Sequence, residues 1–138
     1  MTWITYALAS AGAAALTAIL AKLGVEGVPP TLATAIRTLV VVVFAWGMAA
    51  ALGEGRAVAT VPARSWLFLM LSGLGTGVSW LAYFRALQLG PASRVAPIDK
   101  LSLPLTIVLA AVVLGEAITW RLAAGVALMT IGAFLTLT

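Results

Sequence analysis

The sequence predicts an all-α integral membrane protein with five transmembrane helices in a single domain. Of its 138 residues, 63% are hydrophobic and 9% are charged, whereas a soluble domain carries about 25% charged residues. The apolar residues fall in blocks of roughly 20, the length that crosses the hydrocarbon core of a bilayer as a helix. Runs such as LVVVVFAWGMAAAL lack the apolar–polar alternation of a membrane barrel strand, so helices are expected.

Glycines and prolines bound each predicted helix in turn. The first helix, residues 2–23, stops before Gly24; no basic residue precedes it and no small-residue cleavage site follows it, so we expect a retained span and not a signal peptide. The second, residues 31–52, begins after the prolines of VEGVPP. The third, residues 66–89, follows the longest loop, GEGRAVATVPARS, and ends at the sequence GP. The fourth covers residues 92–114 and the fifth residues 119–138, with a Gly-Glu turn between them.

The basic residues give a weak signal for orientation in the membrane. Five helices place the two termini on opposite sides. The N-terminal side carries Arg56, Arg64 and Arg121, and the other side carries Lys22 and Arg94, with Arg37, Arg85 and Lys100 near its edge. This near-balance is compatible with insertion in both orientations, and hence with an antiparallel homodimer, and equally with one weakly specified orientation.

The residue types that are missing exclude several classes of protein. The chain has no cysteine and no histidine, which removes disulfides, thiol catalysis and the usual ligands of zinc, haem and iron–sulfur clusters. Its four acidic residues are isolated from one another and its eight basic residues are scattered singly. We therefore expect no metal, no cofactor, no enzymatic activity and no binding of nucleic acid.

Four of the predicted helices carry their polar residues in a narrow stripe, within roughly 60° of arc at 100° per residue. Four such stripes suggest a shared hydrated cavity that takes a small-molecule substrate. The alternative for any one stripe is a hydroxyl bonded to its own backbone or to a neighbouring helix. The candidate binding residues on or beside the stripes are Tyr6, Ser10, Thr34, Thr38, Thr76, Ser79, Trp80, Tyr83, Ser102 and Thr106.

Four charged residues lie about 6–14 Å from the nearest loop at 1.5 Å per residue, all nearer the same side. They are Arg37, Arg85, Asp99 and Lys100, and a charge at this depth must be paired, hydrated or carried to the interface. The two arginines have stems long enough to snorkel, which is the simpler interpretation for both. Asp99 is too short to snorkel and is the sharpest functional candidate, either for substrate binding or for proton coupling.

Two prolines flank this aspartate within the fourth helix. Pro97 cannot donate to the carbonyl of Ser93, and Pro104 cannot donate to that of Lys100. The sequence therefore predicts free carbonyls and a bend beside a charge, a pattern typical of transporter sites. Adjacent side chains on a continuous helix point about 100° apart, so Asp99 is predicted to pair with Arg37 or Arg85 and not with Lys100, which would face the cavity or a second subunit.

The fifth helix has a face of small residues instead of a polar stripe. Gly125 and Gly132 are seven residues apart and share that face. Small residues let helix backbones approach closely in lipid, so this face is a candidate dimer seam.

With these features in place, the sequence resembles EamA-type members of the drug/metabolite transporter superfamily. The resemblance lies in LATAIRTLVVVVFAWG, in the stretch from Ser79 to Leu135 and in the first span up to AKLGVEGV. It is most specific from YFRALQLGPAS to LGEAIT and at the glycines of the last helix. It implies an exporter or exchanger of small metabolites. Many members have ten helices in two inverted repeats, so this chain resembles one repeat that a homodimer would complete. Glu116 matches the Gly-Glu turn of the family, which we interpret as a carboxylate near the start of the last helix, favourable at a helix N-terminus.

The resemblance also bears on substrate and location. Small multidrug-resistance relatives carry an embedded glutamate in their first helix, whereas this first helix has no acidic residue. The membrane charges, three positive and one negative, favour anionic or zwitterionic metabolites. We expect a secondary transporter in the cytoplasmic membrane of a prokaryote. The alternatives are a flippase subunit for a lipid-linked sugar within a hetero-complex and a non-transporting membrane assembly protein.

Overall fold

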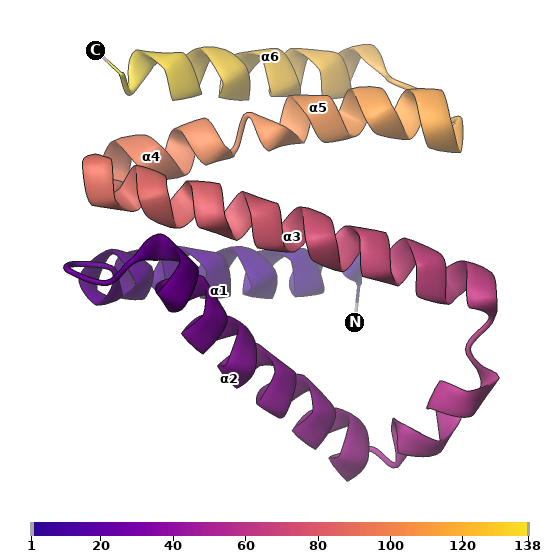
Figure 1. The fold of residues 1–138 in the computed structure, drawn as a ribbon. Coiled ribbons are helices and arrows are strands. Elements are labelled where there is room, and N and C mark those ends of the chain that lie inside the picture. Colours follow the sequence, from indigo (N-terminus) through magenta and orange to yellow (C-terminus); the bar gives the residue numbers. More distant parts are fainter. Residues whose placement is uncertain (1, 138) are drawn as a thin grey trace. The chain divides into compact units, whose positions relative to one another are not determined.

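The computed structural model describes residues 2–137 and confirms the all-α prediction, since no strand occurs in that range. Two short segments depart from α-helical geometry: η1 is a 3₁₀-helix and η2 is a π-helix. The helices, shown in Figure 1, are α1 (Trp3–Gly24), α2 (Pro30–Ala51), η1 (Glu54–Thr60), α3 (Ala63–Leu89), α4 (Ala92–Asp99), α5 (Ser102–Leu109), η2 (Ala110–Leu114) and α6 (Trp120–Leu135). Residue 138, the last of the predicted fifth helix, lies outside the described residues.

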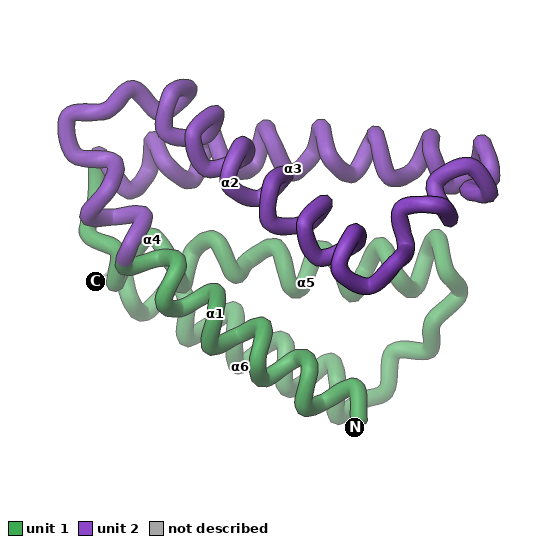
Figure 2. The backbone as a smooth tube through the Cα atoms, turned by 90° about the horizontal axis from the view of Figure 1, so that it is seen from below, with its two compact units in different colours: residues 1–19, 89–138 green, residues 20–88 purple. Residues whose placement is uncertain are grey.

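The chain divides into two compact units, coloured separately in Figure 2. One unit comprises residues 20–88, which contain the end of α1, then α2, η1 and α3. The other comprises residues 1–19 and 89–138, which contain most of α1 together with α4 to α6. The prediction of a single domain stays a prediction.

In the unit of residues 20–88, α2 and α3 run in opposite directions. Proline is favoured in the first turn of a helix because its missing N–H has no partner there, and α2 begins at Pro30. At its other end, Gly53 adopts a left-handed conformation with φ of 74°, which turns the chain into η1. The two helices lie close where α2 begins and α3 ends, and they diverge towards η1 (Figure 1). Val25, Phe84 and Leu87, each at most 2% exposed, lie at the close end.

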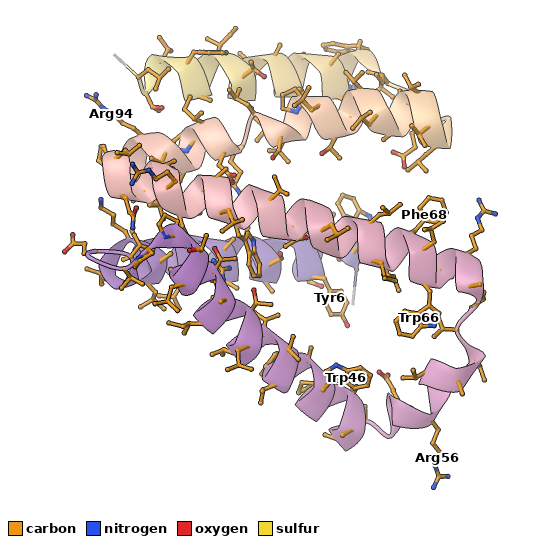
Figure 3. The ribbon with its side chains drawn as sticks, viewed as in Figure 1. Tyr6, Trp46, Arg56, Trp66, Phe68 and Arg94 are labelled. Atoms are coloured by element: carbon orange, nitrogen blue, oxygen red, sulfur yellow. The ribbon has the colours of Figure 1, made fainter. Side chains whose placement is uncertain are left out.

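At the diverging end of the same unit, two tryptophans stay exposed. Trp46 extends from the side of α2 that faces α3, and Trp66 from the side of α3 that faces α2 (Figure 3). Their exposed fractions are 55% and 45%. The large apolar side chains of this region therefore lack the packing that a water-soluble core would give them.

In the other unit, α6 packs along α4 and α5. The predicted bend in the fourth span is present as a full break at Lys100 and Leu101, where both amides bond three residues back, to Pro97 at 3.1 Å and to Ile98 at 3.0 Å. The carbonyl of Lys100 is not left free, contrary to our expectation. The amide of Leu103 donates to it at 2.9 Å, taking the place of the donor that Pro104 lacks.

The turn before α6 also corrects one expectation. Gly115 ends η2 in a left-handed conformation with φ of 70°, but Glu116 lies four residues before the first residue of α6. Thr119 caps that helix instead, because its side-chain oxygen accepts a hydrogen bond from the amide of Leu122 at 3.3 Å.

Length and composition mark this chain as an integral membrane protein. Four apolar helical segments are long enough to cross a bilayer, namely α1, α2, α3 and the broken span Ala92–Leu114. The last apolar helix, α6, has 16 residues. Large apolar side chains are exposed along all of them, as expected of surfaces that face lipid. The fifth crossing remains a prediction.

Candidate substrate-binding site

The threonines of the predicted polar stripes bond to their own helices. Each of these hydroxyls donates to the carbonyl four residues earlier, at distances from 2.8 to 3.0 Å. Bonding of a hydroxyl to its own backbone is the alternative to a shared hydrated cavity that the sequence analysis gave for each stripe. The hydroxyl hydrogens are thereby committed, while the oxygens keep lone pairs that can accept a further bond. The residues concerned are Thr34, Thr38, Thr76 and Thr106.

The other stripe residues differ in exposure. Tyr6, labelled in Figure 3, and Ser10 are exposed on α1. Ser79 is exposed on α3 and Ser102 at the start of α5. Tyr83 is half-buried, and its ring centroid lies 6.4 Å from that of Phe84. A cavity shared by these side chains stays a prediction.

The structure brings Arg37 of α2 together with two aromatic rings of α3. The guanidinium carbon lies 4.2 Å from the ring centroid of Trp80 and 5.6 Å from that of Phe84. Both distances are within the range of a cation–π interaction. This contact joins two predicted site residues, and Phe84, which the sequence analysis did not select, completes it.

The two ring contacts place the guanidinium of Arg37 along α3. At 1.5 Å per residue, the Cα atom of Phe84 lies about 7 Å, and that of Trp80 about 13 Å, from the end of α3 at Leu89. The guanidinium is closer to the deeper ring. Since helical side chains lean towards the N-terminus, the ring of Trp80 points deeper still. Snorkelling of Arg37 stays a prediction, because its own side chain leans towards the start of α2 at Pro30.

Arg37 also lacks a carboxylate partner within its unit. The acidic residues among the described residues 20–88 are Glu26 and Glu54, and neither forms an ion pair with it. Within the same described range, the guanidinium makes no hydrogen bond, which leaves its N–H groups available. The aromatic faces of Trp80 and Phe84 partly compensate its charge.

We predicted that Asp99 would not pair with Lys100, its neighbour in the chain, and that part of the prediction was wrong. The Oδ2 atom of Asp99 lies 3.3 Å from the Nζ atom of Lys100, although we expected adjacent residues to point apart. That expectation assumed a continuous helix, whereas α4 ends at Asp99 and Lys100 stands in the break. Arg85, the other proposed partner, is exposed and donates to the Oε1 atom of Gln88 at 3.3 Å.

The sequence analysis missed a polar cluster at the close end of α2 and α3. The Nε2 atom of Gln88 donates to the carbonyls of Val25 and Val28, and the Nζ atom of Lys22 donates to the carbonyl of Leu87 at 2.6 Å. A signal was available, since Gln88 is the only carboxamide side chain in the sequence. Gln88 lies one residue from the end of α3, away from the polar stripe of that helix.

The two glycines of the predicted dimer seam lie on an open face of α6. A Cβ atom built on Gly125 or Gly132 would meet nothing within 4 Å. The seam itself stays a prediction. Within residues 2–137 the acidic side chains form no group that could hold a metal ion.

Comparison with known proteins places the chain in a family. A sequence model of the EamA-like transporter family matches residues 1–138. A Sinorhizobium protein named "Uncharacterized transporter in cobO 3'region" is 48% identical over 134 residues, which cover 97% of this chain and 95% of that protein. No solved structure matches. A match over the full described length, on a chain of long apolar helices, leads to one conclusion: this protein belongs to the EamA-like transporter family.

Proposed function

We propose that this protein is a secondary transporter that exports or exchanges small metabolites by alternating access in the cytoplasmic membrane of a prokaryote. Membership of the EamA-like transporter family supports transport, and the bacterial homologue supports the location. The coupling of transport to protons is assigned to Asp99, whose carboxylate stands at the break between two short helices.

The transporter works as a homodimer in this proposal. One chain supplies five crossings, so two copies supply ten, and antiparallel copies would have the inverted symmetry on which alternating access depends. The near-balance of basic residues and the open face around Gly125 and Gly132 support this arrangement. So does the exposure of large apolar side chains on α6, such as Leu128 at 70%.

The single observation that carries a binding function is the position of Arg37. A cation turned into an apolar helix pair, without a carboxylate among the described residues of its unit, is costly unless a ligand or water compensates it. Ionisable residues inside membrane spans are functional by default for that reason. Arg37 and Trp80 are therefore the proposed centre of the substrate site, with Tyr83, Thr34 and Thr38 beside them.

The test is transport by the purified protein in proteoliposomes, using a panel of radiolabelled amino acids, carboxylates and sugar phosphates. Flux of at least one compound above protein-free vesicles supports the proposal. Flux of none, with or without a proton gradient, contradicts it. A tag on each terminus, read from each side of the membrane, tests the dimer: the same tag found on both sides supports antiparallel copies, and each tag confined to one side contradicts them. Stable co-purification with another membrane protein would instead indicate a flippase subunit.

A further inference from the structure

We infer that Arg37, held over the rings of Trp80 and Phe84, forms an oxyanion-binding site for a carboxylate or phosphate group. The inference rests on the proposed function only for its ligand, which in a transporter is the anionic end of the metabolite. The site itself rests on the contact of α2 with α3 within one unit.

The first step is that the guanidinium of Arg37 has few groups around it that offset its positive charge. Aromatic faces attract a guanidinium, and the guanidinium carbon of Arg37 lies 4.2 Å from the ring centroid of Trp80. The N–H groups point outwards in the plane of the group. Among the described residues of the unit none of them is bonded, so the hydrogen-bonding edge is free while the charge is held in place.

The second step is the chemistry that fits this edge. A guanidinium is a rigid planar fork that matches the two oxygens of a carboxylate or phosphate, and such bidentate bonds are charge-assisted. The fork is more weakly hydrated than an ammonium, which suits a partly dry site. Trp80 fixes the fork in advance, so less rotational freedom is lost on binding.

The third step concerns other anions. Asp99, the carboxylate that the sequence paired with Arg37, is bonded to Lys100 at 3.3 Å. A phospholipid headgroup offers the same oxygens as a soluble phosphate. The Cα atom of Arg37 lies about 10 Å from the start of α2 at Pro30, and a soluble anion is the ligand that we favour.

The experiment uses Trp80 as a built-in reporter. The other four of the five tryptophans are replaced in Trp3→Phe, Trp46→Phe, Trp66→Phe and Trp120→Phe, and the full chain is reconstituted in phosphatidylcholine vesicles. Phosphate and succinate are titrated at constant ionic strength against sodium chloride. We expect a saturable change in Trp80 emission with at least one of them and none with chloride alone. Calorimetric titration of the wild-type chain provides a readout that needs no replacement.

Matched variants separate the site from general charge. Arg37→Lys keeps the charge but loses the fork, and we expect affinity to fall by about tenfold or more, the equivalent of one charge-assisted bond. Arg37→Gln should remove saturation. Arg64→Lys is the control, because Arg64 contacts Phe68 at 5.8 Å in a similar pair near the start of α3, and its affinity should be unchanged. Elution as a single species in size-exclusion chromatography shows that each variant is folded.

The outcomes are distinct. Loss of saturation in Arg37→Gln alone supports the site. Saturation that survives Arg37→Gln, or no saturation with phosphate, succinate or added phosphatidylglycerol, overturns it. A response to phosphatidylglycerol only would support the site and assign its oxyanion to a lipid headgroup. Arg37-dependent binding without flux would contradict the proposed function alone, and flux without anion binding would contradict this inference alone.

Discussion

The side-chain amide nitrogen of Gln88 lies 2.6 Å from the carbonyl oxygen of Val28. The same nitrogen donates to the carbonyl of Val25 at 3.0 Å, and the Oε1 atom accepts from Arg85. One carboxamide thus ties the last turn of α3 to the turn between α1 and α2. Because α2 begins two residues after Val28, this tie also fixes the point from which Arg37 reaches Trp80.

Gln88→Leu should destabilise the fold. The replacement keeps a similar volume but leaves the carbonyl of Val28 without its donor and that of Val25 with the amide of Val28 alone, which costs about 1–3 kcal/mol in the free energy of unfolding. The measurement is reversible unfolding in mixed detergent micelles. Thr5→Val is a matched control, because it removes an exposed side-chain bond to the carbonyl of Thr2, and surface changes usually stay within about 0.5 kcal/mol. Equal stability of Gln88→Leu and Thr5→Val would contradict the role assigned to Gln88.

Asp99→Asn should change stability little and transport strongly. The side chains of Asp99 and Lys100 are 36% and 56% exposed, and ion pairs as exposed as this contribute less than about 1 kcal/mol. If Asp99 carries the proton, proton-driven flux in proteoliposomes should fall to background while binding of succinate persists. Full proton-driven flux in the variant would remove Asp99 from the coupling site. A large loss of stability would show instead that its pair with Lys100 holds the break together.

Gly125→Leu and Gly132→Leu should separate folding from dimerisation. Both positions are open in the single chain, so a larger side chain should leave the fold intact, whereas a closely packed seam would be forced apart. The mass of the protein in nanodiscs, measured by light scattering, should change from dimer to monomer. Gly12→Leu on α1 is the matched control, since that position is equally open. Dimers that survive both α6 variants would rule out this face.

Single cysteines at positions 79, 102 and 106 test for the hydrated cavity. The chain has no native cysteine, so Ser79→Cys, Ser102→Cys and Thr106→Cys can each be labelled without background. A membrane-impermeant, water-soluble thiol reagent should label all three in proteoliposomes if they line a hydrated cavity, and addition of a transported substrate should slow the labelling. Protection of all three from the start would favour dry helix packing and a non-transporting role.

The sequence was sufficient for features that depend on one segment at a time. Apolar blocks and their Gly and Pro boundaries predicted all-helical structure, and the prolines around Asp99 predicted the disruption of the fourth span. The failures arose where one element meets another. The angles of a continuous helix did not predict the pairing of Lys100 with Asp99, because the helix is broken there. The contact of Arg37 with Trp80 was not predicted, because the two residues belong to different helices and are 43 residues apart in the sequence. Gln88 was missed because its partners are backbone carbonyls.

The shortness of α6 has a consequence for the lipid around the protein. Its 16 residues span about 24 Å, less than the hydrocarbon thickness of about 30 Å. To cross, it must thin the bilayer locally or draw other helices to its ends, and both responses carry an energy that depends on acyl-chain length. Hydrophobic mismatch would thus favour self-association in thicker membranes, so the length of the surrounding lipid tails would influence formation of the proposed homodimer.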